Sequence, residues 1–258
     1  MTLSVIVPTI DASVPSLPSN PCVETIVVRG VSPVSAARNE GLSRATGEYI
    51  AWVDADDEVS EDWLSSILQG LEARPDVLSF NARVIWTDGK RPSYVIGGTA
   101  YAADVMAERT NGQLWNKVIR RELFDGLEFQ GAVHEDYRLL CNLLPRARSF
   151  AHIPKTLYIY RRGRSGASQF PNEKNALSAL KGLVEMCEKL QPNYGREMRK
   201  GVAQRIADFS INSRGTWTLR KFILKGLCGL LFDGRISARA KVKCILAAVG
   251  FRRGNKRI

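Results

Sequence analysis

The first 86 residues alternate between short apolar segments and amphipathic ones, and this alternation limits the possible folds more than any other feature of the sequence. Four segments are rich in β-branched or aromatic residues and have the length of buried strands, at residues 3–7, 25–28, 49–53 and 77–86. Helices are expected between them. Ser32-Pro33 starts one that would close at Gly47, and Ser60 precedes apolar residues at helical spacing. The alternation predicts an α/β fold with a mostly parallel sheet flanked by helices.

One connection breaks the alternation. Residues 11–21 contain Pro15, Pro18 and Pro21, and a helix cannot form there because each proline removes a backbone donor and blocks the preceding turn. A loop is therefore expected where an alternating fold usually has a helix. Later in the chain we expect short strands between residues 113 and 170, a helix near 134–144, and longer helices over 173–190 and 195–213.

An acidic run follows the third apolar segment directly. Asp54, Asp56, Asp57 and Glu58 lie at the predicted carboxyl end of a strand, where ligands bind in parallel sheets. Repulsion among these carboxylates calls for an offsetting charge. A hard divalent cation, Mg²⁺ or Mn²⁺, would supply it through oxygen ligands shared with substrate phosphates. The alternative is a negatively charged first helical turn that interacts favourably with the helix dipole.

Two further segments contain candidate functional residues. Glu135 and Asp136 begin an apolar-periodic segment, and a carboxylate at a helix N-terminus suits a general base acting on a hydroxyl. Plain helix capping is the alternative. Arg161, Arg162 and Arg164 form a basic, hydroxyl-rich segment after a strand. Their guanidinium groups suit a diphosphate, and a solvated arginine loop is the alternative.

Cysteine usage and hydropathy limit the compartment. The five cysteines are scattered and form no C-x-x-C pair, which indicates a reduced protein without a zinc site or disulfide framework. The N-terminal segment lacks the basic region of a signal peptide, and no segment reaches the ~18 apolar residues of a membrane span. A cytoplasmic protein is therefore expected.

The net charge of +11 is concentrated at the C-terminal end. Residues 1–212 hold 25 basic and 25 acidic residues, whereas residues 213–258 hold 12 basic residues and one acid, Asp233. Two segments in this tail place apolar residues on one helical face and basic residues on the other, which predicts an anchor on the anionic inner face of the cell membrane. Packing of these faces within the protein or a dimer is the alternative. No nucleic-acid partner is expected, because the neutral body lacks a recognition motif.

Taken in order, these segments resemble family 2 glycosyltransferases, which have the nucleotide-sugar-binding glycosyltransferase A fold. The matching motifs are SVIVPT at 4–9, ARNEGL at 37–42, ATGEYI at 45–50, VDADD at 53–57, WNK at 115–117 with RRELF at 120–124, HED at 134–136 and YIYR at 158–161. The resemblance covers residues 3–168 and implies a catalytic domain over residues 1–212.

The resemblance implies an inverting transfer of a sugar from a nucleotide-diphosphate donor to a hydroxyl of a glycan or polyprenyl-diphosphate-linked acceptor, as in bacterial surface polysaccharide assembly. It implies that Asp54 and Asp56, with Ala55 between them, hold Mg²⁺ or Mn²⁺ against the donor diphosphate. Asp136, with Glu135 beside it, would be the general base. The other implied contacts are Pro8, Thr9, Asp11, Arg38 and Arg161 for the nucleotide sugar, and Trp115 and Asn116 for the sugar or acceptor.

Two features depart from the family pattern. Arg29-Gly30 follows the second strand, where the family usually has an acidic pair that holds the nucleoside. The helix that normally joins the first two strands is replaced by the proline-rich loop, in which Asp11 is a candidate substitute for the missing acidic contact. A degenerate relative that binds a sugar or a partner without catalysis is therefore the alternative function.

Overall fold

The computed structural model describes most of the first 163 residues. The described residues are 1–10, 14–89, 91–107, 109–110, 112–131, 134–163, 182 and 193–194. The expected helix over 173–190 apart from Gly182, the helix over 195–213, the domain boundary at 212 and the basic tail lie outside them and stay predictions. In this described part of the chain, no helix has the length and apolar character needed to cross a membrane.

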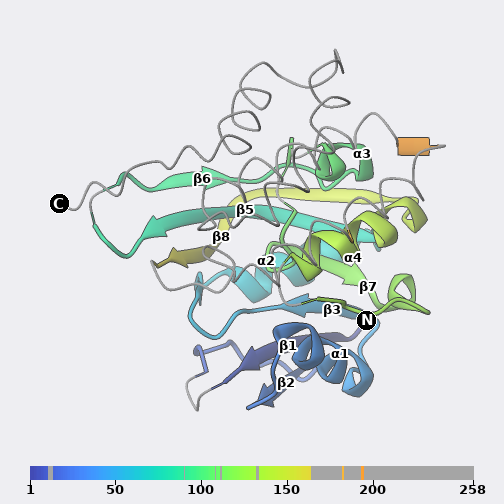
Figure 1. The fold of residues 1–258 in the computed structure, drawn as a ribbon, viewed down its shortest axis with the longest axis horizontal. Coiled ribbons are helices and arrows are strands. Elements are labelled where there is room, and N and C mark those ends of the chain that lie inside the picture. Colours follow the sequence, from blue (N-terminus) through green and yellow to red (C-terminus); the bar gives the residue numbers. More distant parts are fainter. Residues whose placement is uncertain are drawn as a thin grey trace, which may run out of the picture. The chain divides into compact units, whose positions relative to one another are not determined.

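Residues 1–105 and 109–164 form one compact unit built on a single sheet (Figure 1). The strands are β1 (Leu3–Thr9), β2 (Val23–Arg29), β3 (Tyr49–Trp52), β4 (Glu58–Val59), β5 (Val77–Trp86), β6 (Tyr94–Ile96), β7 (Lys117–Arg120) and β8 (Phe150–Arg162). The helices are α1 (Val34–Arg44), α2 (Trp63–Leu71), α3 (Ala102–Met106) and α4 (Glu135–Leu143), with 3₁₀ turns at Arg121–Phe124 and Leu144–Arg146. The predicted α/β fold with flanking helices is confirmed.

The sheet has the strand order β2-β1-β3-β7-β5-β8-β4, and β6 pairs with β5. β1 is parallel to β2 and β3, and β5 is parallel to β8. The pairs β3–β7, β5–β7, β4–β8 and β5–β6 are antiparallel. The longest strand pairs, β1–β2 and β5–β8, are parallel, in agreement with the predicted mostly parallel sheet. The antiparallel pairs are shorter, and those of β7 arise because it inserts between β3 and β5 in the opposite direction.

Helices cover both faces of β1. Successive side chains of a strand point to opposite faces of the sheet, so each face of β1 packs against a different helix. Leu3, Val5 and Val7 share a buried cluster with residues of α2. Ile6 points to the other face, where a Cβ atom added to Gly41 of α1 would lie only 2.3 Å from its Cγ2. β1 and β3 are buried along their whole length, so the strand that precedes the acidic run and its parallel neighbour lie in the core.

The helix starts differ from the expected ones. Pro33 is the N-cap of α1 and Asp62 that of α2, so Ser32 and Ser60 are not the caps. The Ser60 hydroxyl instead donates to Asp62 Oδ1 at 2.8 Å. Both helices begin one or two positions later than the sequence pattern predicted, which is the usual uncertainty at helix ends.

Gly47 has a different role from the predicted C-cap. α1 ends at Arg44, and Ala45 follows in an extended conformation. A Cβ atom at Gly47 would lie 2.6 Å from the backbone nitrogen and from the hydroxyl oxygen of Ser4. Glycine is required here because β1 passes too close for any side chain.

The proline-rich connection contains no helix over its described residues 14–22, as predicted. Val14 and Leu17 pack against the core cluster, and the Leu3 amide donates to the Cys22 carbonyl oxygen at 3.0 Å. The loop thus lies against the sheet edge with part of its apolar surface buried. Asp11, its candidate donor-binding residue, lies outside the described residues.

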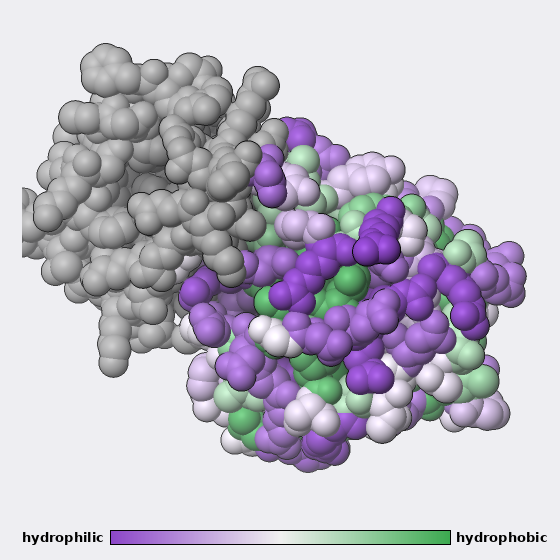
Figure 2. Space-filling model, turned by 90° about the vertical axis from the view of Figure 1, so that its right-hand side faces the viewer, coloured by the Kyte–Doolittle hydropathy of each residue, from purple (hydrophilic) through white to green (hydrophobic). Residues whose placement is uncertain are grey.

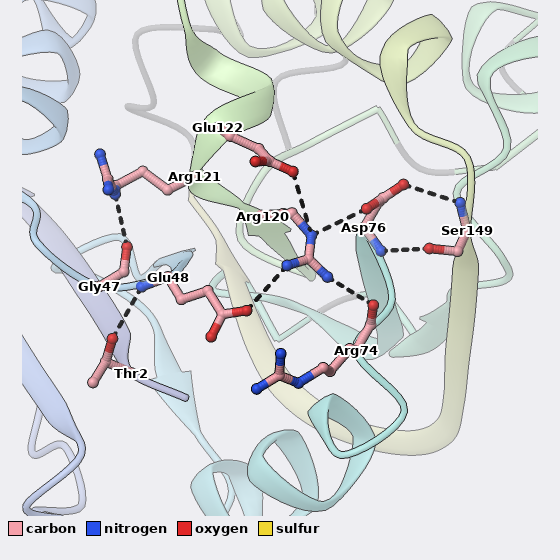
Figure 3. A network of polar contacts seen from close by, with 9 residues as sticks. All are labelled: Thr2, Gly47, Glu48, Arg74, Asp76, Arg120, Arg121, Glu122 and Ser149. Atoms are coloured by element: carbon pink, nitrogen blue, oxygen red, sulfur yellow. Dashed lines mark hydrogen bonds and ion pairs between the residues drawn. The ribbon is translucent and has the colours of Figure 1, made fainter.

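A polar network around Arg120 joins the amino ends of β3 and β5 to the end of β7 (Figure 3). The Arg120 guanidinium donates to Glu48 Oε1 at 3.0 Å, to Asp76 Oδ1 at 3.1 Å and to the Arg74 carbonyl oxygen at 2.8 Å. It also lies 5.0 Å from the ring centroid of Tyr49. Figure 2 shows the molecule from the right-hand side of Figure 1, where these strand ends lie, and the described surface there is mostly hydrophilic.

Replacing Arg120 by leucine should lower the free energy of unfolding by about 2–4 kcal/mol, because the partly buried carboxylates of Glu48 and Asp76 lose their shared cation. Urea denaturation measures this loss. Arg109→Leu is the matched control, since Arg109 is half exposed and pairs only at the surface with Asp104, so its loss should stay within about 0.5 kcal/mol. Equal losses in the two variants would contradict a stabilising role for the network.

Candidate functional site

The predicted donor-binding residues of β1 and the acidic run meet at one edge of the sheet. β1 and β3 are parallel with Ile6 opposite Trp52, so the residues that follow leave the sheet on the same side. Pro8 and Thr9 are the last two residues of β1, and both are buried. Asp54 comes two positions after the end of β3. The carboxyl ends of these strands therefore form the edge at which the site is built.

The carboxylates of the acidic run differ in accessibility. Asp57 is 2% exposed, and its side chain accepts hydrogen bonds from the Tyr158 hydroxyl at 2.9 Å and the Arg161 amide at 2.8 Å. Burial and the nearby Asp54 charge raise the pKa of Asp57 to about 8, although both hydrogen bonds act in the opposite direction. Asp54 is partly exposed and Asp56 is exposed. Asp57 is thus an internal support, while Asp54 and Asp56 face solvent.

Tyr158 connects the acidic run to the body of the sheet. Its hydroxyl accepts from the Asp54 amide at 3.1 Å and donates to Asp57. Burial raises the pKa of this hydroxyl well above its usual value, so it remains a donor. The Trp115 ring stacks on Tyr158, with centroids 4.8 Å apart and an interplanar angle of 11°, and on Tyr160 at 5.3 Å. Trp115 therefore supports the acidic run from within the protein.

Arg38 of α1 joins the acidic run to the start of α4. Its guanidinium donates to Asp54 Oδ1 at 3.2 Å and forms a short ion pair with Glu135 Oε1. The residue is 5% exposed, and its guanidinium carbon lies 5.9 Å from the ring centroid of Phe129. Burial alone would lower the pKa of Arg38, but the charges of Glu135, Asp54 and Asp136 outweigh it and raise the pKa. Arg38 is therefore a permanent cation shared by the carboxylates of the site.

Glu135 and Asp136 occupy the first turn of α4 but have different surroundings. Glu135 is 6% exposed, and burial raises its pKa while the Arg38 guanidinium opposes that rise. Asp136 is only partly buried, and its Oδ1 accepts the Tyr137 amide at 2.7 Å. Of the two predicted catalytic carboxylates, Asp136 is the more exposed.

The other predicted contacts are distributed around this core. Asn116 is 1% exposed and donates to the Phe80 carbonyl oxygen at 3.1 Å, so like Trp115 it is used inside the protein. The Arg161 guanidinium binds Glu58 Oε1 through Nε at 2.9 Å and Nη2 at 2.5 Å. Ala55 is partly buried between the two aspartates. The expected contacts of Trp115, Asn116 and Arg161 with sugar, acceptor or diphosphate stay predictions.

Two residues that hold the site together were missed by the sequence prediction besides Tyr158. Asn39 donates to the Phe129 carbonyl oxygen at 3.0 Å and accepts the Phe129 amide at 2.8 Å, which fixes the segment before α4. Lys117 is a buried cation next to Asn116. Asn39 follows Arg38, and Lys117 follows Asn116, within motifs that resemble the family. Their position directly after a predicted site residue was the sequence signal that could have identified them.

The donor set fits a hard divalent cation that is shared with a substrate. Across the described ranges, no group of three or more His, Cys, Asp or Glu side chains is placed to hold a metal by itself. Mg²⁺ in nucleotide sites usually takes one or two protein carboxylates and completes its shell with phosphates and water. Asp54 and Asp56 would supply oxygen ligands of this kind, whereas both oxygens of Asp57 already accept hydrogen bonds.

Solved structures share the fold. The structure of residues 1–349 of TarS from S. aureus, in complex with UDP-GlcNAc, superposes with a TM-score of 0.66 over 97% of this chain and 88% of that chain, at 15% sequence identity. The structure of the same segment in complex with UDP gives a TM-score of 0.60.

Several curated relatives are similar to part of this sequence. Glycosyltransferase GlyA of Streptococcus pneumoniae is 25% identical over 191 residues, which is 66% of this chain and 27% of GlyA. The cholesterol galactosyltransferase of Borreliella burgdorferi is 28% identical over 62% of this chain and 53% of that protein. GlyG of Streptococcus pneumoniae is 31% identical over 59% of this chain and 56% of GlyG. The chain thus spans between a quarter and just over half of these relatives.

The sequence model of "Glycosyl transferase family 2" matches residues 17–127, which include α1, the acidic run and the Trp115-Asn116-Lys117 segment. The match agrees with the motifs of the sequence, with the relatives and with the shared fold. The matched segment, residues 17–127, belongs to glycosyl transferase family 2.

Proposed function

We propose that the protein is an inverting glycosyltransferase that moves a sugar from a nucleotide-diphosphate donor to a hydroxyl group. The observation that carries the proposal is the Arg38 cluster, which joins Asp54 to Glu135 beside the accessible Asp136. Burying such charges costs several kcal/mol per ion, so a chain gains little from this cluster unless it serves a site. The UDP-GlcNAc bound by TarS supports a nucleoside diphosphate as the leaving group.

In the proposed reaction Asp54, Asp56 and Asp136 each have one task. Asp54 and Asp56 would hold Mg²⁺ or Mn²⁺, which would neutralise the charge on the leaving diphosphate when bound. Asp136 takes the proton from the acceptor hydroxyl as that oxygen attacks the anomeric carbon from the side opposite the diphosphate. Arg38 binds both Asp54 and Glu135, so it fixes the donor end of the site relative to the base.

The remaining residues bind the two substrates. Pro8 and Thr9 border the nucleotide at the carboxyl end of β1. Arg161, whose side chain is 44% exposed, contacts the leaving diphosphate in exchange for Glu58. Trp115 and Asn116 shape the floor beneath the sugar or acceptor.

The acceptor is a glycan or a polyprenyl-diphosphate-linked glycan used in surface polysaccharide assembly. This part of the proposal rests on the charge distribution, with a catalytic domain over residues 1–212 and a basic tail over 213–258. Such a tail would hold the enzyme at an anionic membrane surface, where lipid-linked acceptors are presented.

A non-catalytic sugar-binding or partner-binding relative is the second candidate. The observation that favours it is the end of β2, where Arg29 and then Gly30, with φ of +70°, replace the acidic pair of the family. The described part of the preceding loop also provides no helix beside the nucleotide. Such a relative would bind a donor without releasing its sugar.

A donor panel tests the proposal. The full chain is incubated with Mn²⁺ and each nucleotide sugar, with a soluble glycan or with a polyprenyl-diphosphate-linked acceptor in anionic vesicles, and nucleoside diphosphate release is measured. Asp56→Ala should lower the release about 10²–10³-fold, because a bound metal contributes several kcal/mol to leaving-group stabilisation. Glu61→Ala, an exposed acid just after the run, should retain the wild-type rate. Calorimetric donor binding without any release would favour the non-catalytic relative.

A further inference from the structure

The ends of β5 and β8 bring two arginines against one tryptophan. Trp86 is opposite Arg162 in the parallel register of these strands. The guanidinium carbon of Arg162 lies 4.7 Å from the centroid of the Trp86 ring, and that of Arg91 lies 3.8 Å from it. Both distances are those of cation–π contacts. Trp86, Arg91 and Arg162 together make up the Trp86 cluster.

The Trp86 cluster lies at the same edge of the sheet as the acidic run. β3 and β5 are both antiparallel to β7, so β5 and β8 run in the direction of β1 and β3. The arrowheads of β1 and β5 accordingly point to the same side in Figure 1. β8 also contacts the acidic run directly, since the Arg161 amide donates to Asp57 Oδ1 at 2.8 Å. The cluster therefore belongs to the carboxyl edge that contains the proposed metal ligands.

The cluster lies further along the strands than the acidic run. Glu58, the last residue of the run, is opposite Ile159 of β8, and Arg162 follows three positions later. A strand advances about 3.3 Å per residue, so the cluster lies roughly 10 Å beyond the run along β8. Arg162 is also four positions after Tyr158, which places both side chains on one face of the strand. The Tyr158 hydroxyl bonds to the acidic run, so the face that supports the run continues outward to the cluster.

The described contacts leave binding capacity on both arginines of the cluster. Arg91 donates to Asp88 Oδ2 at 3.3 Å, and its side chain remains 51% exposed. The Nε atom of Arg162 is buried and has no hydrogen-bond partner among the described residues. Two cations that contact the same ring repel each other. An anion bound by both guanidinium groups would offset this repulsion.

A phosphate group has the chemistry that suits this arrangement. A guanidinium group binds phosphate through two parallel hydrogen bonds, which add direction to the attraction of opposite charges. The donor diphosphate is the proposed partner of the metal at Asp54 and Asp56, and the cluster lies beyond that position along β8. A phosphate that reaches the cluster would therefore belong to the acceptor.

We propose that the Trp86 cluster binds a phosphate group of the acceptor through the guanidinium groups of Arg91 and Arg162, which the indole ring holds in place. This inference rests on the proposed transferase function. It narrows the acceptor to molecules that carry a phosphate group near the sugar to be extended. A cluster that only stabilised the connection between β5 and β6 would not distinguish a phosphate-bearing acceptor from a neutral one.

The kinetic test compares two acceptors in the full chain with the best donor of the panel. One is a polyprenyl-diphosphate-linked glycan, and the other is the methyl glycoside of the same glycan. Arg91→Met should raise the KM for the diphosphate-linked acceptor about 10- to 100-fold, the usual effect of losing a hydrogen bond to a charged group. The KM values for the methyl glycoside and for the donor should stay within about twofold, because neither uses the cluster.

Arg109→Met is the matched control for the kinetic test. Arg109, like Arg91, is half exposed and pairs with one aspartate at the surface. This variant should keep the wild-type KM for both acceptors. Equal losses of Arg91→Met with the two acceptors, or an increase confined to the donor KM, would overturn the proposal.

A binding measurement keeps this inference separate from the proposed function. Inorganic pyrophosphate is titrated into the full chain in the presence of EDTA, so that no divalent metal takes part, and tryptophan fluorescence is followed. Binding beside Trp86 should change the fluorescence, and the change should be lost in Trp86→Phe, which keeps an aromatic ring at this position. Arg91→Met and Arg162→Met should each weaken the binding about 10-fold or more, whereas Arg109→Met should not.

The titration has a clear result even without turnover. If the wild-type chain releases no nucleoside diphosphate from any donor, the transferase proposal fails, and the titration alone decides whether the Trp86 cluster binds phosphate. The absence of a fluorescence change in the wild type, or a change that persists in Trp86→Phe, would overturn the inference. Wild-type affinity in both Arg91→Met and Arg162→Met would overturn it as well.

Discussion

Replacing Asp136 by asparagine should lower kcat roughly 10²–10⁴-fold, the range that a general base contributes. The substitution is nearly isosteric, and the amide oxygen can still accept the Tyr137 amide, so the first turn of α4 should keep its structure. The donor KM should change little, because Asp54 and Asp56 are the proposed donor ligands. Steady-state transfer kinetics with saturating acceptor measure the effect.

Two variants serve as references for this result. Asp125→Asn, in an exposed position, should have wild-type kinetics and stability. Glu135→Gln should lose activity and stability together, because the buried Arg38 would lose a charged partner. A rate for Asp136→Asn within tenfold of the wild type would assign the base to another group.

Replacing Arg38 by methionine should lower the free energy of unfolding by about 3–5 kcal/mol at pH 8, the usual cost of removing one partner from a buried ion pair. Glu135 would then be buried without its cation, and Asp54 would lose a hydrogen bond. Urea denaturation measures the loss. Arg44→Met provides the control, since Arg44 belongs to the same helix and its side chain is 50% exposed.

The loss caused by Arg38→Met should depend on pH. Burial raises the pKa of Glu135 in the folded protein above the ordinary value of 4.5 that applies to the unfolded chain. The folded state therefore binds more protons between these two values, and stability falls as pH rises through this window. Without Arg38 the folded pKa rises further, which widens the window. The variant should thus be more destabilised at pH 8 than at pH 5.

A double variant provides the decisive comparison. Adding Glu135→Gln to Arg38→Met removes the unpaired charge, so most of the lost stability at pH 8 should return and the pH dependence should flatten. A double variant no more stable than Arg38→Met would show that packing of the guanidinium, and not its charge, is what stabilises this region.

The sequence predicted the local elements and the fold class, but not which strands pair with one another. The strand over Val77–Trp86 has the predicted bounds, and Leu64, Ile67 and Leu71 of α2 are buried as their helical spacing indicated. Apolar periodicity reports which side of an element is buried, and that is a local property. The place of β7 between β3 and β5 depends on contacts far apart in the chain, for which the sequence carried no readable signal.

The site was predicted in part for the same reason. The acidic run and the Glu135-Asp136 pair were found because each is a contiguous motif. The bond from Arg38 to Glu135 joins residues 97 positions apart, and only the fold brings them together. Spacing also could not reveal that both oxygens of Asp57 are bound internally, or that the Trp115 ring is covered by Tyr158.

The Arg120 network and the carboxylates occupy opposite edges of one sheet, since Arg120 pairs with the first residue of β3 and Asp54 follows its last. The Arg120 network is thus separated from the carboxylates by the length of a short buried strand. We therefore expect the loops that follow β1 and β3 to tolerate changes in length and sequence, because the Arg120 network continues to hold the opposite ends of the strands together.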